Sequence, residues 1–275
     1  MLDVHPPHES VHTWRDFFIH IATICVGLLI AVALEQGVEA IHHRHERRDL
    51  EEQMRVESVR NLDLVKAEIH FATARSLYLG QCLQALQSPS PSGDSVTVML
   101  PANRVALSTG LLISPSQGTW TVARAAGTVA LLPPEEAKIY ARLNLAEDFE
   151  QVAEAATGSS TLASTRLRDH LPDGIATPVR LTLAQRDDLL YAFSQSSEAN
   201  ANLKFRLVIL EGALDAVLAH VPTLEDMYPY QQRALQRENA GGPNDRSYIA
   251  DNPNPDPSPG IQVAHPLPVQ SPHHH

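Results

Sequence analysis

The chain of 275 residues carries a formal net charge of −11, and 43% of its residues are hydrophobic although only 5% are aromatic. The acidic balance argues against a nucleic-acid partner, because affinity for phosphates depends on a basic face. Leu, Ala and Val must therefore form the core, and this composition favours helices over sheets.

The first predicted element is a transmembrane helix over residues 13–41, preceded by a flexible, histidine-bearing segment at residues 1–12. Its centre is the apolar run of eighteen residues from Phe17 to Leu34. At about 1.5 Å per residue this run spans roughly 27 Å, close to the hydrocarbon thickness of a bilayer. The sequence therefore predicts the lipid bilayer as a partner and the cell inner membrane as the location.

A cleaved signal peptide is the alternative reading of the same run, since Ala31-Val32-Ala33 offers an A-x-A cleavage site. Residues 1–16 are acidic, however, whereas a signal peptide begins with a basic region.

The arginines around the apolar run predict its orientation. Arg15 precedes the run, whereas a cluster of arginines follows it, at Arg44, Arg47, Arg48 and Arg55. Since Lys and Arg favour the cytoplasmic side, we expect the C-terminal domain to lie in the cytoplasm.

Small residues recur every four positions along the predicted membrane helix, at Thr23, Gly27 and Ala31. This spacing lets two helices approach closely in lipid. It predicts a helix–helix interface and a homodimer, although small residues are also common in membrane helices that do not associate.

Just after the apolar run, Glu39, His42, His43 and Glu46 share one helix face. Glu-x-x-His is the spacing of carboxylate-bridged metal sites in helical bundles. No second Glu-x-x-His follows at a suitable position, so a solvated face near the lipid headgroups is the alternative. The sequence predicts no other cofactor.

Residues 42–237 are predicted to form a helical soluble domain with a Ser/Pro linker near 88–95. The first helix continues to about residue 87, a short strand is predicted at Val96 to Leu100, and helices follow at about 119–132 and from Pro133. Apolar residues give the latter helix a stripe, at Ile139, Leu143, Ala146 and Val152.

The longest helix after the linker is predicted to begin with a Thr182/Gln185 capping box and to end before Pro222. Its stripe contains two polar residues, Ser196 and Asn200, and is apolar from Leu203 onward. A polar residue on such a stripe fixes register between helices or marks a stretch that faces water. We expect Leu207 to be buried against the helix that carries Leu79 and Leu83.

The fold class predicted from these patterns is all-α. One N-terminal transmembrane helix is followed by an antiparallel helical bundle and a disordered, Pro-rich C-terminal tail over residues 238–275. The first helix also carries a long apolar stripe, from Leu62 to Leu86, and a coiled coil formed by this stripe and that of the longest helix is the alternative to the bundle.

One set of residues resembles a group of small bacterial single-pass membrane proteins of unknown function. The likeness lies in the run VGLLIAVALEQGVEA and in a helical domain that contains Thr119-Trp120, Gly127, Leu131-Leu132 and Tyr140. It implies a membrane anchor with a C-terminal helical domain and implies no activity.

The sequence contains no nucleophile elbow, phosphate-binding loop, His-Glu-x-x-His motif or paired-cysteine zinc spacing, so it predicts no catalytic residues. The favoured hypothesis is a non-enzymatic, membrane-anchored module that binds an unknown protein partner or copies of itself. The alternative is a metal-binding or enzymatic domain whose site assembles only in three dimensions.

Overall fold

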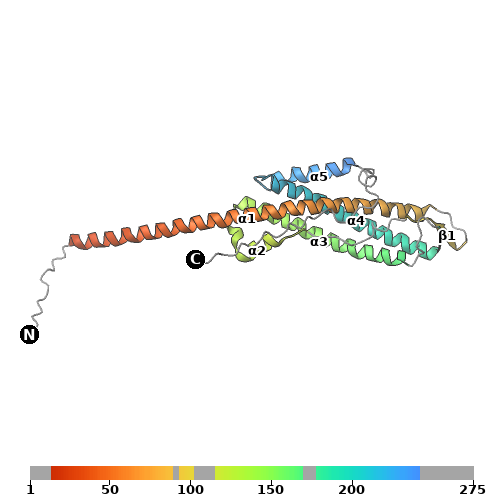
Figure 1. Cartoon of the computed structure of the whole chain (residues 1–275), viewed down its shortest axis with the longest axis horizontal. Helices are drawn as coiled ribbons and strands as arrows, with labels where there is room; N and C mark the ends of the chain where they lie inside the picture. The colour runs from red at the N-terminus through yellow and green to blue at the C-terminus, as the bar shows by residue number, and fades with distance from the viewer. Residues whose placement is uncertain (1–13, 89–92, 102–114, 170–177, 242–275) are drawn as a thin grey trace, which may run out of the picture.

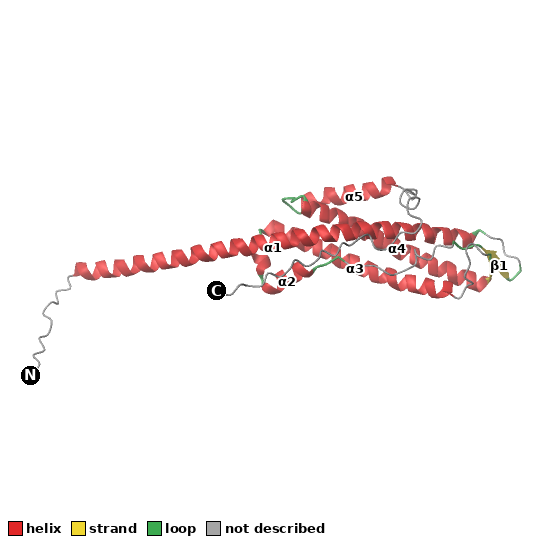
Figure 2. Ribbon diagram, viewed as in Figure 1, coloured by secondary structure: helices red, strands yellow, loops and turns green. Residues whose placement is uncertain are grey.

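A computed structural model describes residues 14–88, 93–101, 115–169 and 178–241 of the chain. One long helix, α1 (Trp14–Gln87), extends from a bundle of helices at its C-terminal end (Figure 1). The predicted segment 1–12 and Thr13 lie outside the described residues. The predicted helical fold is confirmed, with a small sheet added at one end (Figure 2).

Helix α1 is continuous over 74 residues, which corresponds to about 110 Å. Its first part contains an 18-residue window of mean hydropathy 2.6 in which no residue is buried, so it is long and apolar enough to cross a membrane. Among the residues whose burial is described, the first buried one is Leu50. The boundary predicted at residue 42 is therefore not a break in the backbone, because the same helix enters the bundle.

The bundle consists of α1, α3 (Pro134–Asp169) and α4 (Leu183–Leu218), with α5 (Tyr228–Gly241) packed on α4. Helix α4 is central, since it packs against each of the other three (Figure 1).

The helix directions correct one part of the prediction. Asn200 of α4 bonds to Ala72 of α1, and the earlier Phe193 of α4 lies in a cluster with the later Leu79 of α1, so α4 runs antiparallel to α1 as expected. Helices α1 and α3, however, are parallel, because Asn61 contacts Glu147 and the later Glu68 lies near the later Glu150. The reason is that α2 begins at the opposite end of the bundle from the end of α1 (Figure 1).

Three apolar clusters form the core. The central cluster joins all the bundle helices and contains Val65, Ala72, Ile139, Leu143, Leu203, Leu207, Leu210, Leu214 and Met227. A second cluster at the far end includes Leu79, Leu86, Leu189 and Phe193, and a third at the near end includes Leu50, Met54, Ala123 and Leu132.

Leu207 is only 1% exposed, which confirms its predicted burial. It lies in the central cluster with Val65 and Ala72, whereas Leu79 and Leu83 belong to the far cluster. Leu207 therefore packs against the predicted helix, α1, but against residues nearer its N-terminus than the predicted Leu79 and Leu83.

A two-stranded antiparallel sheet closes the far end of the bundle. Strand β1 (Ser95–Val98) confirms the predicted strand with a shifted boundary, and it pairs with β2 (Val179–Thr182) in a register that places Ser95 opposite Thr182. Strand β2 was not predicted, because its four residues are too few to show a period.

Helix α4 begins with the predicted capping box. The Gln185 amide donates to the Thr182 hydroxyl at 3.2 Å, and the Thr182 amide donates to the Gln185 side-chain oxygen at 2.9 Å. Together these bonds satisfy two amides that the first helical turn leaves without partners.

The helix predicted over 119–132 is two elements, α2 (Gly118–Ala126) and the 3-10 helix η2 (Thr128–Leu131). Gly127 separates them with φ 78°, a left-handed conformation that ends a helix and favours glycine.

Helix α5 follows a short 3-10 helix, η3 (Glu225–Met227), and its buried side includes Gln231 and Ala234. The predicted tail was to begin at 238, but α5 continues to Gly241, because its inner face packs on α4. The rest of the predicted tail, 242–275, lies outside the described residues.

Gly212 allows α5 to approach α4 closely. A Cβ atom at this position would lie 2.5 Å from the Gln231 Cα and 2.8 Å from its amide nitrogen. We expect Gly212→Ala to lower the unfolding midpoint, because backbone cannot move aside as a flexible side chain can, and overpacking costs about 1–3 kcal/mol.

Gly80→Ala is the matched control. Gly80 is exposed inside α1, and a Cβ there would meet nothing within 4 Å. This change should stabilise the chain by up to about 1 kcal/mol through helix propensity. Urea unfolding of both variants measures the difference, and equal midpoints would contradict the close α4–α5 contact.

Candidate functional site

Polar side chains line much of the bundle interior. Eleven residues on the facing sides of α1, α3 and α4 are buried, namely Ser58, Asn61, Glu68, Arg75, Glu147, Glu150, Thr157, Thr161, Ser164, Ser196 and Asn200. We call this set the polar layer. Burying such groups costs free energy unless they are neutral or hydrogen-bonded, so their presence calls for an explanation.

The polar layer on α3 follows the same helical spacing as the apolar residues before it. Ile139 and Leu143 are buried, and Glu147, Glu150 and Thr157 continue the buried face. The predicted stripe member Val152 is instead 69% exposed, because it points away from α4. Continuing the spacing through polar residues would have found this face.

The carboxyl groups of Glu68, Glu147 and Glu150 form the acidic part of the layer. Burial, followed by the charges of Glu150 and Glu154, raises the pKa of Glu68 to about 8, although the charge of Arg75 opposes this shift. Burial likewise raises the pKa of Glu150 to about 7, with a further contribution from Glu154. Both Glu150 oxygens lack a hydrogen-bond partner within the described part of the chain, as does one oxygen of Glu68. These surroundings favour the neutral, protonated carboxyl group.

Arg75 lies two helical turns beyond Glu68 on the same face of α1. Burial lowers the pKa of its guanidinium group, while the charge of Glu68 raises it. The guanidinium carbon also lies 4.7 Å from the centre of the Phe71 ring. This buried cation is therefore placed to interact with the ionised form of Glu68.

Asn61 connects the acidic part to the start of α2. Its side-chain amide donates to the Ser116 carbonyl at 2.9 Å and to Glu147 at 3.0 Å, and its oxygen accepts from the Ser116 amide. Burial raises the pKa of Glu147 to about 8, although the Asn61 bond opposes this shift. Glu57 accepts the Gly118 and Thr119 amides at 3.0 Å, which satisfies the N-terminus of α2.

A cavity of about 20 Å³ lies beside these groups, lined by residues that include Glu57, Asn61, Trp120, Tyr140 and Glu147. Such a volume holds about one water molecule. Trp120 and Tyr140 both pack against the cluster at the near end of the bundle. Two of the residues that carry the resemblance to small bacterial single-pass membrane proteins therefore lie together here. Burial, followed by the charge of Glu136, raises the pKa of Tyr140 to about 12.

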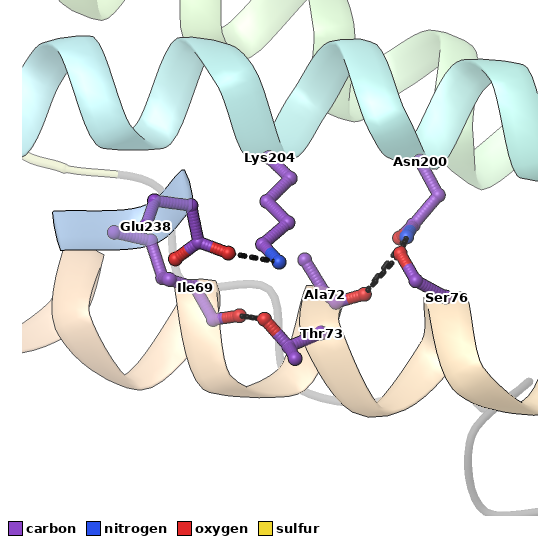
Figure 3. Close-up of polar contacts among 7 residues, drawn as sticks. All are labelled: Ile69, Ala72, Thr73, Ser76, Asn200, Lys204 and Glu238. Carbon is purple, nitrogen blue, oxygen red and sulfur yellow. Dashed lines mark hydrogen bonds and ion pairs between the residues drawn. The ribbon is translucent and has the colours of Figure 1, made fainter. Parts of the chain in front are cut away.

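The neutral part of the layer joins the helices by hydrogen bonds. The Asn200 amide donates to the Ala72 carbonyl and to the Ser76 hydroxyl, both at 2.8 Å (Figure 3). The Ser196 hydroxyl lies 2.9 Å from the Ser160 carbonyl and 3.0 Å from the Ser164 hydroxyl. Ser196 and Asn200 are thus buried, which favours the register role over the solvent-facing one.

Helix α5 is linked to the same region through a charged pair. Lys204 of α4 binds Glu238 of α5 one turn along from Asn200 (Figure 3). A hydrogen bond of 2.8 Å from the Thr73 hydroxyl to the Ile69 carbonyl lies below this pair on α1.

The predicted metal ligands lie on the exposed part of α1, outside the bundle. They form two separate pairs, with His42 Nε2 3.1 Å from Glu46 Oε1 and His43 Nε2 4.0 Å from Glu39 Oε1. Within the described ranges, no group of three or more His, Cys, Asp or Glu residues could hold a metal ion. Metal binding at these residues stays a prediction.

The predicted helix–helix interface is exposed. The Thr23 hydroxyl bonds to the Ile19 carbonyl of its own helix at 2.8 Å, and a Cβ at Gly27 would meet nothing within 4 Å. Ala31 is exposed as well. This face is open to a partner, and its role in self-association stays a prediction.

The chain matches no protein-family model, no curated protein and no solved structure in the comparisons made. The resemblance to small bacterial single-pass membrane proteins therefore stays a hypothesis that rests on the quoted residues.

Proposed function

We propose that this chain is a membrane-anchored helical module that acts by binding another protein or a second copy of itself. The observation that carries the proposal is the continuity of α1, which places an unburied apolar segment and one wall of the bundle on a single helix. A helix without a break holds the bundle at a set distance and rotation relative to the membrane. Such an arrangement suits a module that presents a surface to partners.

The interior of the bundle supports a binding role over a substrate pocket. The cavity beside Glu147 has room for about one water molecule. The alternative of a metal-binding or enzymatic domain stays a hypothesis, and its residues would be those of the polar layer.

We expect the full-length chain to stay in the membrane pellet after carbonate extraction and to need detergent for release. Replacing both Ile24 and Leu28 with Arg should release it, because each charge at the centre of a membrane helix costs about 2.5–3.5 kcal/mol. Gln36→Arg, outside the apolar run, serves as the control. A soluble product that begins at Leu34 would instead support the signal-peptide reading.

We further propose that the membrane is the cell inner membrane and that the bundle lies on its cytoplasmic side. The support is the arginine bias, with Arg44, Arg47 and Arg48 after the apolar run and Arg15 before it. Protease added outside intact spheroplasts should leave the bundle whole and degrade it only after lysis. Degradation before lysis would contradict this orientation.

A further inference from the structure

From the end of the apolar run to the start of the bundle, α1 is a largely exposed helix. We call residues 34–49 the stalk, which is about 24 Å long. Three large apolar side chains on it are mostly exposed, Leu34 at 66%, Val38 at 68% and Ile41 at 59%. Within the described chain nothing covers these side chains, which we call the stalk stripe. Figure 1 shows the N-terminal part of α1 clear of every other helix.

The stalk stripe continues a line that begins inside the apolar run. Ile24, Gly27 and Ala31 precede Leu34, Val38 and Ile41 with alternating spacings of three and four residues. Beyond Ile41 the same spacing falls on His45, Arg48, Glu52 and Arg55, so the apolar line ends within the stalk. A seven-residue repeat of this kind is the pattern by which two parallel helices pack along their length.

The stripe faces away from the molecule's own bundle. At about 100° per residue, Leu50 lies about 120° and Met54 about 160° around the helix axis from Val38. Leu50 and Met54 are the first α1 residues that the bundle buries. A helix laid along the stalk stripe therefore meets the open side of α1.

We propose that the stalk stripe is covered by the stalk of a second copy of this chain, in a parallel and in-register dimer. This inference rests on the proposed membrane anchoring. Two anchored copies point the same way and carry the stripe at the same height above the bilayer, so each stripe finds its match in the other. In this register Glu35 lies on the flank and does not face its counterpart.

The charges beside the stripe favour the same arrangement. Arg44 and Asp49 lie on opposite flanks of the stripe and five residues apart, which is the spacing that pairs flanking charges between parallel helices. Some stalk charges are paired within the helix, as His42 is with Glu46 and Arg47 with Glu51, whereas Glu35 and Arg48 form no ion pair with a described residue. Neither Arg44 nor Asp49 forms an ion pair with any residue that the structure describes. A second copy supplies both partners.

Cysteine cross-linking of the full-length chain in its native membranes tests the proposal. In a Cys25→Ser background, Val38→Cys should form a disulfide-linked dimer under mild oxidation. Gln36→Cys is the matched control, since it lies two residues away on the opposite side of the stalk. We expect several-fold more dimer from Val38→Cys. Equal yields, or no dimer from Val38→Cys, would overturn the proposal.

A charge exchange tests the register. In the Val38→Cys chain, Arg44→Asp or Asp49→Arg alone should reduce the dimer yield several-fold, and the two together should restore it. A double variant as weak as the singles would overturn the parallel, in-register pairing. Carbonate extraction of the same membranes separates the two proposals. A chain that stays in the membrane without cross-linking refutes the dimer alone, and one that cross-links at Val38 but washes off refutes the anchor alone.

Discussion

Leu207→Asp is expected to unfold the bundle at room temperature. Leu207 is 1% exposed and lies in the central cluster, where α1, α3, α4 and η3 all contribute side chains. The variant loses a packed leucine and buries a carboxylate without a partner. The two effects together cost several kcal/mol, a large part of the 5–15 kcal/mol by which typical domains are stable.

The control for Leu207→Asp is Ala201→Asp, which adds the same charge to an exposed position of α4. We expect it to cost well under 1 kcal/mol, mostly through helix propensity. Circular dichroism during urea unfolding compares the two variants in detergent. Similar midpoints for both would show that the central cluster does not depend on Leu207.

The sequence was sufficient to predict α4 because its signals are local. Thr182 and Gln185 form the expected capping box, and Leu207 is buried as its stripe requires. The position along α1 at which each residue of α4 packs could not be predicted from local sequence. It depends on the sheet at the far end and on the bonds of Asn200 to Ala72 and Ser76, which join residues more than 120 positions apart.

The inner face of α3 was missed for a different reason. Apolar periodicity identifies a buried face only where the buried residues are apolar, and after Leu143 they include Glu147, Glu150 and Thr157. A glutamate is ordinarily a surface residue. Its burial here depends on Asn61 and on other groups that only the folded chain brings near.

The exposed face of α1 was predicted in part. Thr23, Gly27 and Ala31 were predicted to form an interface, which stays a prediction, whereas the line through Leu34, Val38 and Ile41 was not predicted. Charged residues lie between these apolar residues in the sequence, so their three- and four-residue spacing is not apparent. Its significance depends on the finding that the bundle begins at Leu50 and lies on the other side of the helix.

The bundle is expected to lose stability as the pH rises from about 5 to about 8. The cause is the acidic part of the polar layer, where burial raises the pKa of Glu68 and Glu147 to about 8 and that of Glu150 to about 7. An unfolded chain ionises the same groups near their ordinary pKa of 4.5. The folded chain therefore holds more protons than the unfolded chain throughout this window.

The direction follows from proton linkage. When the native state binds more protons, the free energy of unfolding falls as the pH rises. The contribution is fully present below pH 4.5, declines through the folded pKa values and is lost above about 8. One pKa unit corresponds to about 1.4 kcal/mol, so the three groups together contribute on the order of several kcal/mol. Arg75 reduces this loss by favouring the ionised form of Glu68.

Glu150→Gln separates this contribution from every other titration in the chain. The amide keeps the shape of the protonated carboxyl group and does not ionise, so the variant should be more stable than wild type at pH 8 and should show a flatter pH dependence. Glu198→Gln, an exposed position on α4, provides the control and should follow the wild-type curve. Urea midpoints at pH 5, 6, 7 and 8 give the three curves. If the Glu150→Gln curve runs parallel to wild type, the pKa of the Glu150 carboxyl group is not raised in the folded chain, and bound protons do not explain the burial of this residue.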